Sequence, residues 1–327
     1  MSKKILFVCP FQNAEAKKFV ESLAGGLVHL TPKIKDANVG SFWFDPSNYD
    51  LVHYFLPASA PLLTRTIRKG AQTKIVQTII NEGPGLNKSI FADAVVTFSD
   101  QQRHTINQKK QVKSITILPC LRMDEGKRGT PVSIREKYSV NDRLLAVALN
   151  DFKDQQHFSA FLYTAREYQR RGGFRFLLPL YSKDRQSLTW RSKLQHSITH
   201  ERLSATTLVD ESADLHSLIG ASDLTLLIDK RTDREFGFPL AAIESISAGK
   251  PLIAFDVSPV NEIVAAFQND WIARAYEDFS RISRDLARQA PELEQISTEF
   301  ARFARTKMSI ESVSQQHEQL YNSLLSL

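Results

Sequence analysis

The stretch FGFPLAAIESISAGKPLIAFDVSPVNEIV, residues 236–264, decides the fold of this chain. It predicts a helix over Leu240–Ala248, because Pro239 suits the first turn of a helix and Gly249 lies where a helix should end. The apolar runs on either side of this helix predict two short buried strands, Leu224–Ile228 and Leu252–Phe255. A strand, a helix and a second strand in tandem are typical of a parallel sheet.

The rest of the chain repeats this alternation, which predicts an α/β protein with parallel sheets covered by helices on both faces. The further strands expected are Lys4–Cys9, Asp50–Phe55, Thr73–Ile80, Ala94–Phe98, Ser114–Leu118, Leu144–Leu149, Phe174–Leu178 and Thr206–Val209. The further helices expected are Ala14–Leu27, Leu62–Lys69, Asp100–Gln108, Ser133–Tyr138, 158–170, Ser187–Ile198, Ala213–Ile219, Tyr276–Arg288, Leu293–Lys307 and Ile310–Leu325.

The length of 327 residues suits two domains of ordinary size. A polar stretch, Met123–Pro131, is expected to link them. We therefore expect an N-terminal domain over residues 1–124, a C-terminal domain over residues 125–310, and a C-terminal helix over residues 311–327.

Cysteine content and apolar runs bear on the compartment. Only Cys9 and Cys120 are present, which favours a reducing environment. The run Ile5–Cys9 is too short for the apolar region of a secretory signal, and no segment approaches the ~18 apolar residues of a membrane span. We expect a cytoplasmic protein that binds membranes, if at all, peripherally.

The positive charge is concentrated in the first part of the chain. Residues 1–131 hold 18 Lys and Arg against 10 Asp and Glu, whereas residues 132–327 hold 24 against 26. A basic first half favours anionic partners, such as a lipid head group, a phosphate or nucleic acid. The alternative is a solvated surface that only keeps the protein soluble, since the basic residues form no dense run.

The stretch quoted above resembles the donor-binding signature of glycosyltransferase family 4, within the glycosyl transferases group 1. Fifteen positions fall in register with that signature: Gly237, Phe238, Pro239, Glu244, Ala248, Gly249, Lys250, Pro251, Ile253, Ala254, Asp256, Val257, Glu262, Ile263 and Val264. The resemblance implies the GT-B fold, in which two doubly wound Rossmann-like domains face each other across a cleft. The N-terminal domain would bind the acceptor, the C-terminal domain the nucleotide sugar, and the last helix would return to the N-terminal domain.

The resemblance assigns a role to one glutamate and departs from the family at another. Glu244 is implied to bind the ribose hydroxyls of the donor, the alternative being a carboxylate that complements a helix dipole. The backbone of Gly237, Phe238, Pro239 and Leu240 would face the sugar and phosphates. The family's first glutamate, eight positions before Glu244, is replaced by Phe236. Glu235 is our candidate for the catalytic role of that missing glutamate.

Two basic residues and one histidine complete the predicted site. Lys153, in the loop after strand Leu144–Leu149, and Arg231 are the expected diphosphate ligands, the alternative being solvated loop charges. His53 is a candidate base or hydrogen-bond donor, although a lone histidine in a strand is more often a core residue. No cluster has metal-ligand spacing, so we expect no metal and no cofactor beyond a UDP- or GDP-hexose donor.

The predicted function is transfer of a hexose from a nucleotide sugar to an acceptor hydroxyl with retention, the acceptor being a lipid-linked or phosphate-bearing glycan. The alternative is a degenerate protein of the same fold that serves an active glycosyltransferase as partner or scaffold. No G-x-G-x-x-G or G-x4-G-K-[ST] motif is present, which argues against a nicotinamide-dependent enzyme and a P-loop kinase. No nucleic-acid-binding signature appears, so nucleic acid is not an expected partner.

Overall fold

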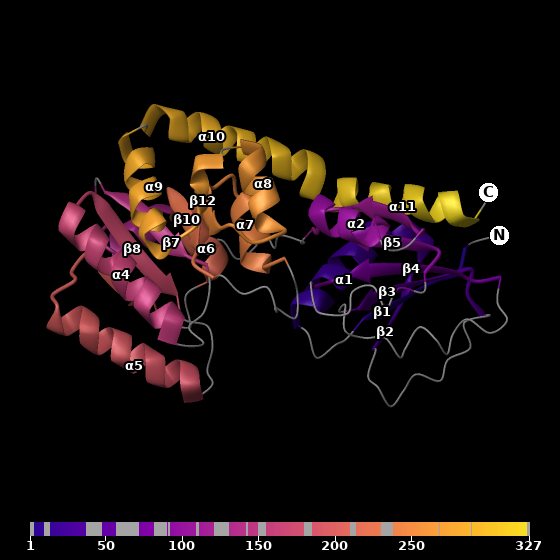
Figure 1. Ribbon diagram of the computed structural model, residues 1–327, viewed down its shortest axis with the longest axis horizontal. Helices are drawn as coiled ribbons and strands as arrows, with labels where there is room; N and C mark the ends of the chain where they lie inside the picture. The colour runs from indigo at the N-terminus through magenta and orange to yellow at the C-terminus, as the bar shows by residue number, and fades with distance from the viewer. Residues whose placement is uncertain are drawn as a thin grey trace. The chain divides into compact units, whose positions relative to one another are not determined.

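The computed structural model (Figure 1) describes residues 3–9, 14–36, 48–56, 72–81, 90, 92–108, 111–120, 131–141, 143–149, 155–179, 185–209, 214–229, 238–267, 269–288 and 290–325. The chain forms two compact units: the first comprises Met1–Arg122, Arg231–Ile243 and Arg305–Leu327, and the second comprises Met123–Lys230 and Glu244–Ala304. Each unit is built on one parallel sheet, which confirms the expected α/β class.

The sheet of the first unit has six strands in the order β2-β1-β3-β4-β5-β6. All its neighbouring strands are parallel. The strands are β1 (Ile5–Cys9), β2 (Lys33–Asp36), β3 (Leu51–Leu56), β4 (Lys74–Ile79), β5 (Ala94–Thr97) and β6 (Lys113–Thr116). The helical elements are α1 (Ala14–Gly26), the short turn η1 (Val28–Leu30), α2 (Asp100–Asn107), the π-helical turn η5 (Ala304–Met308) and α11 (Ile310–Leu325).

Both faces of this first sheet are buried. One face carries an aliphatic cluster that includes Leu6, Val52 and Ile106 of α2. The other face carries aromatic residues, where Phe55 of β3 lies 5.8 Å from the ring centroid of Phe19 on α1. Burial on two faces explains why these strands read in the sequence as continuous apolar runs rather than as alternating ones.

The sheet of the second unit has the order β12-β11-β10-β7-β8-β9 and is also parallel. Its strands are β7 (Leu144–Ala148), β8 (Phe174–Pro179), β9 (Thr206–Val209), β10 (Leu224–Leu227), β11 (Leu252–Phe255) and β12 (Ile272–Ala273). The helical elements are α3 (Pro131–Lys137), α4 (Gln155–Arg171), α5 (Arg185–His200), α6 (Leu215–Ala221), α7 (Leu240–Ser247), α8 (Val260–Phe267), the short turn η4 (Asn269–Trp271), α9 (Tyr276–Arg288) and α10 (Ala290–Phe303).

Helices cover both faces of this second sheet too. Leu145 and Leu177 pack in a cluster with Leu218 of α6 on one face. On the other face Phe176 makes an edge contact with the ring of Tyr168 on α4, and the Tyr168 hydroxyl lies 2.6 Å from Ser283 Oγ of α9. The strand order, counted from β7, is that of a doubly wound sheet whose chain starts in the middle and winds outward both ways.

The helix that the deciding stretch predicts is α7, and it ends at the expected place. Gly249 has a φ of +69°, in the left-handed region that favours glycine. Its N–H donates to the Ile246 carbonyl (3.0 Å), and the next N–H, of Lys250, donates to the Ser245 carbonyl (3.0 Å). These two bonds form a Schellman motif, which satisfies the last carbonyl groups of the helix.

Replacement of Gly249 by alanine is expected to destabilise the protein by about 2–4 kcal/mol. A Cβ there would lie 2.9 Å from the Ser297 carbonyl oxygen and 3.0 Å from Ala301 Cβ, in addition to the strain of the positive φ. Gly173→Ala is the matched control, because Gly173 has a φ of +76° but a Cβ added to it would meet no atom within 4 Å. Urea denaturation should show a loss of only about 1–2 kcal/mol for Gly173→Ala, from the strain of the positive φ alone. Equal losses in the two variants would mean that the contacts with Ser297 and Ala301 add nothing to the cost at Gly249.

Several elements differ from the sequence expectations. The strand β2 and the helix α8 were not predicted, and neither was the two-residue strand β12. The single helix expected over Leu293–Lys307 is instead α10 followed by the π-helical turn η5. The helix expected over Leu62–Lys69 lies outside the described residues.

Candidate functional site

The strand order of the second unit places a candidate ligand site at the carboxyl ends of β7 and β10. These strands are neighbours, yet the chain leaves β7 toward β8 and leaves β10 toward β11. Connections from the two strands therefore diverge, and in open α/β sheets ligands bind in the crevice outside the carboxyl ends at such a point. The elements that start at this edge are α4, after β7, and α7, after β10.

A buried histidine and aspartate meet at this switch point. His157 lies in the first turn of α4, Asp229 follows β10 closely, and His157 Nε2 lies 3.4 Å from Asp229 Oδ1. Their side chains are 5% and 1% exposed, so the pair ties the start of α4 to the end of β10 in a nearly dry environment. Sequence reasoning missed this pair. Its only signal was a polar residue directly after an apolar strand run.

A cavity opens at the same edge, beside the start of α4. Its volume is about 540 Å³, and Gln155, Gln156, Ser159 and Tyr276 line it. Tyr276 is the first residue of α9, which follows β12, so the cavity also lies on the carboxyl side of the sheet. The lining side chains carry amide and hydroxyl groups, which can donate and accept hydrogen bonds.

Glu244 lies on α7, roughly one turn from the start of that helix. The neighbouring residues Ala242, Ile243, Ser245 and Ile246 are completely buried, whereas Glu244 is half-buried. Its carboxylate therefore belongs to the strip of α7 that is not packed into the core. A half-buried carboxylate can accept two hydrogen bonds from a diol, and a charged acceptor makes those bonds stronger than neutral ones.

The residues before Glu244 serve the core with their side chains. Phe238 is completely buried, and Leu240 is nearly so. Pro239 directly precedes α7, and its carbonyl accepts from the amides of Ala242 and Ile243. The expected contact of their backbone with the sugar and phosphates stays a prediction. Four other predicted site residues, Lys153, Arg231, Glu235 and Gly237, lie outside the described residues.

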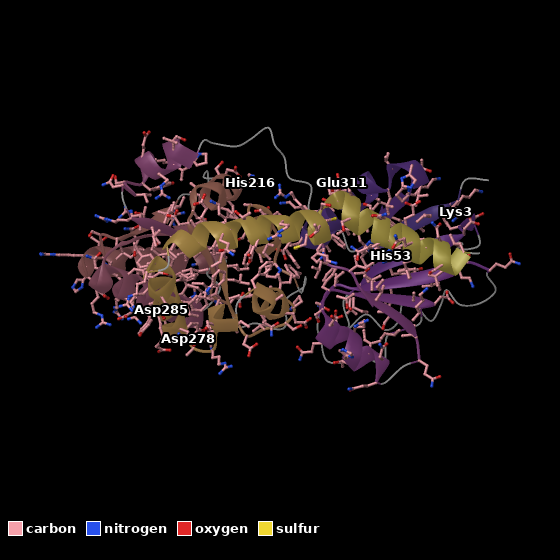
Figure 2. The ribbon with its side chains drawn as sticks, turned by 90° about the horizontal axis from the view of Figure 1, so that it is seen from above. Lys3, His53, His216, Asp278, Asp285 and Glu311 are labelled. Atoms are coloured by element: carbon pink, nitrogen blue, oxygen red, sulfur yellow. The ribbon has the colours of Figure 1, made fainter. Side chains whose placement is uncertain are left out.

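The structure places His53 in the core of the first unit, beside α11 (Figure 2). Its Nδ1 lies 2.7 Å from the Tyr321 hydroxyl, and its Nε2 lies 2.7 Å from Thr78 Oγ1. Burial, together with the nearby His317, holds the pKa of His53 well below its ordinary value. Because both ring nitrogens are engaged and the ring is inaccessible to solvent, its surroundings favour a structural role over the predicted catalytic one.

Lys250 of the signature points away from the candidate site. It precedes β11, and its Nζ donates to the Ser222 carbonyl (2.7 Å), which precedes β10. Both positions are at the amino edge of the sheet. Burial lowers the pKa of Lys250, while Asp223 raises it and Arg135 lowers it further. The lysine therefore joins two strand starts at the amino edge.

We expect Lys250→Met to leave nucleotide affinity within about twofold of wild type, since an interaction made at the amino edge contributes nothing to binding at the carboxyl edge. Calorimetric titration with the nucleotide that binds wild type checks this result. A loss of tenfold or more in a variant that keeps its melting temperature would mean that Lys250 reaches the ligand.

The described residues were also compared with the requirements of a metal site and of a membrane-spanning helix. Within the described ranges, no group of three or more His, Cys, Asp and Glu side chains is arranged to hold a metal ion. No helix among the described residues is long and apolar enough to cross a membrane.

Comparison with known proteins supports the glycosyltransferase signature over part of the chain and the GT-B fold over the whole chain. The family model described as "Glycosyl transferases group 1" matches residues 188–302, which include α7 and Glu244. No curated protein sequence matches the chain.

Solved structures match over nearly the full length. A glycosyltransferase from Rickettsia africae is 13% identical, with a TM-score of 0.72 and full coverage of both chains. Anabaena Alr3699/HepE in complex with UDP is 14% identical, with a TM-score of 0.75, covering 98% of this chain and 100% of that one. The sucrose-phosphate synthase of Thermosynechococcus elongatus is 14% identical, with a TM-score of 0.69 over 98% and 99% of the two chains.

Identities of 13–14% show the fold alone. The predicted resemblance is thus confirmed at the level of the glycosyl transferases group 1, which residues 188–302 match, and the whole chain has the two-domain GT-B fold of solved glycosyltransferases.

Proposed function

We propose that this protein is a glycosyltransferase that moves a hexose from a nucleotide sugar to an acceptor hydroxyl with retention of anomeric configuration. The observation that carries the proposal is Glu244. It is half-buried on α7, at the carboxyl side of a doubly wound sheet, within the segment that matches the family model. In this role the carboxylate accepts hydrogen bonds from both ribose hydroxyls of a UDP- or GDP-hexose. The UDP named for Anabaena HepE supports a uridine donor.

The diphosphate of the donor would lie near the start of α4. An N-terminal helix end presents free N–H groups and a partial positive charge to an anion. The buried pair of His157 and Asp229 holds this helix start against β10. In the sequence, Lys153 follows β7 and Arg231 follows β10. These two residues are our candidates for neutralising the charge of the leaving diphosphate. In this scheme no metal is required, since basic side chains and helix dipoles stabilise the charge.

The acceptor is proposed to bind the first unit. The net positive charge of residues 1–131 fits a lipid-linked or phosphate-bearing glycan. Glu235 remains our candidate for the place of the missing first glutamate. A catalytic role for His53 stays a prediction that its burial disfavours.

One sequence feature favours a second function. Phe236 replaces the first glutamate of the family pair, and the arginine that the family resemblance implies in the loop before Lys153 is absent, so the donor site lacks two charged contacts. A protein with these losses could act as the non-catalytic partner of an active glycosyltransferase.

Donor turnover separates the two functions. Purified protein is incubated with UDP-glucose and, separately, with GDP-mannose, and release of the nucleoside diphosphate is measured with and without a glycan acceptor mixture. The proposed enzyme releases diphosphate slowly with one donor alone and faster with acceptor. A protein that binds the donor but releases nothing under either condition would be the non-catalytic partner instead.

A further inference from the structure

The last two turns of α5 carry two histidines four residues apart, His196 and His200. Side chains at positions i and i+4 of a helix lie on the same face, and four residues rise about 6 Å along its axis. The two ring centroids are 5.9 Å apart, and the ring planes are inclined by only 25°. The imidazoles therefore stand side by side, one turn apart, and present their nitrogens together.

Both rings lie on the solvent side of α5. The helix packs within its unit, beside α4 (Figure 1), through Leu194, which is completely buried, and Ile198, which is 8% exposed. His196 is two positions from each of them, so at about 100° per residue it projects about 160° away from both. His196 and His200 are exposed, and neither ring makes a hydrogen bond or an ion pair with any residue that the structure describes. Their nitrogens are thus available to a ligand.

The backbone that carries the pair is fixed at the end of the helix. Arg202 has a φ of +54°, and its N–H donates to the Thr199 carbonyl (3.2 Å). The next N–H, of Leu203, donates to the Ile198 carbonyl (2.9 Å), and the Leu203 side chain is buried. These bonds form a Schellman motif, anchored by an apolar side chain. A ligand that engages both rings would therefore have only side-chain torsions to order, which lowers the cost of binding.

Two neighbouring cations are held by other groups. Arg166 of α4 donates two bonds of 2.6 Å to Glu201, the residue after His200. These bonds lower the pKa of Glu201, and the nearby ring of His200 lowers it further. Lys193 places its Nζ 4.3 Å from the ring centroid of Trp190, toward the start of the helix. Neither cation is therefore directed at the histidine pair.

The arrangement suits a metal ion. Imidazole nitrogen is a preferred ligand of late first-row transition metals, and two histidines at i and i+4 of a helix can bind one ion together. Two rings bound to one ion at about 2.1 Å would have centroids about 5 Å apart, close to the separation observed here.

We propose that His196 and His200 bind one divalent transition-metal ion of the class Cu²⁺, Ni²⁺ and Zn²⁺ on the surface of α5. Water fills the remaining coordination positions, because the described residues supply no third ligand of the His, Cys, Asp or Glu type. The site needs neither nucleotide nor acceptor, so it does not depend on the proposed transferase function.

Calorimetric titration of the full chain, without an affinity tag, tests the proposal with Cu²⁺, Ni²⁺ and Mg²⁺. Wild type should bind Cu²⁺ more tightly than Ni²⁺ at one site per chain and should not bind Mg²⁺ there, since Mg²⁺ prefers oxygen ligands. H200Q leaves a single ring and should weaken Cu²⁺ binding about 100-fold, because the second bond of a two-point contact forms at a high effective concentration.

Two further variants test the helical spacing. S192H/H200Q replaces an exposed serine and rebuilds an i, i+4 pair with His196 one turn earlier, so it should restore most of the Cu²⁺ affinity. Q195H/H200Q supplies the same number of histidines at adjacent positions, which face different directions, and should stay as weak as H200Q.

The matched control is H29Q/H104Q, which removes two exposed histidines that lie on different elements, η1 and α2. It should bind Cu²⁺ like wild type. All variants should keep their melting temperatures in the absence of metal, because the changed side chains are exposed. The proposal is overturned if wild type binds Cu²⁺ no more tightly than H200Q, if H29Q/H104Q causes the loss instead, or if Q195H/H200Q restores binding as well as S192H/H200Q does.

Discussion

Replacement of Glu244 by alanine should weaken binding of the nucleotide sugar at least about 100-fold, from the loss of two charge-assisted hydrogen bonds to the ribose. The carboxylate is half-buried on α7 among completely buried neighbours, so no other side chain of that turn can take its place. The expected loss applies to the free nucleoside diphosphate as well as to the intact donor, because the ribose is common to both. Isothermal calorimetry measures it.

Two variants make this result specific. E244Q keeps an acceptor oxygen without the charge and should fall between wild type and E244A. E294A removes an exposed glutamate from α10 of the same unit and should bind like wild type. Wild-type affinity in E244A would mean that Glu244 only complements the dipole of α7.

Acidification from pH 7 to pH 4 should destabilise the first unit by about 3 kcal/mol or more through His317 and His53. Burial lowers the pKa of His317 to about 4, although its bond to the Val313 carbonyl raises it, and burial lowers the pKa of His53 as well. Both histidines are neutral when folded, whereas unfolded histidine takes up a proton near pH 6.5. Their contribution is thus fully present above about pH 6.5 and is lost as the pH falls toward 4.

The effect should be greatest at α11, because the two histidines lie at its contact with the sheet. Their ring centroids are 5.6 Å apart, and the Tyr321 hydroxyl of α11 bonds to His53. Hydrogen exchange of the α11 amides, corrected for its intrinsic dependence on pH, should show protection that falls by 100-fold or more between pH 7 and pH 4.5. H317L should retain more of that protection, since one titrating group is gone. Equal acid sensitivity in H317L would contradict the assignment.

The elements around Glu244 could be predicted because each has a local signal. Three signals were available within a few residues: the proline before α7, the glycine after it, and the apolar run of β11. The structure confirms the start of α7 at Leu240, its end at Gly249 and the strand Leu252–Phe255. The C-terminal helix was predicted with the bounds that it has in the structure, Ile310–Leu325, because its apolar residues recur at helical spacing.

Elements without a local signal were missed. The edge strand β2 has lysines at alternate positions, Lys33 and Lys35, and exposed Ile34 between them, so its pattern is not that of a buried strand. Edge strands commonly carry such lysines because these oppose pairing with another chain. The first turn of α8 contains Asn261 and Glu262, directly after Pro259, which reads as a loop.

Contacts between distant residues could not be predicted at all. His157 and Asp229 meet only because β7 and β10 are neighbours in the sheet, and this pairing follows from the strand order. The same holds for His53 and Tyr321, which lie near opposite ends of the chain. A single sequence shows the residue types in such pairs but not that they meet.

The measurement that tests the central claim most directly is calorimetric titration of the wild-type protein with UDP, GDP, UDP-glucose and GDP-mannose. The proposed donor site predicts that one of the two nucleoside diphosphates and its sugar bind at a single site per chain, and that the other pair does not. If none of the four binds to protein that is folded by circular dichroism and melts cooperatively, the second unit has no working donor site, and the proposed transferase activity is wrong.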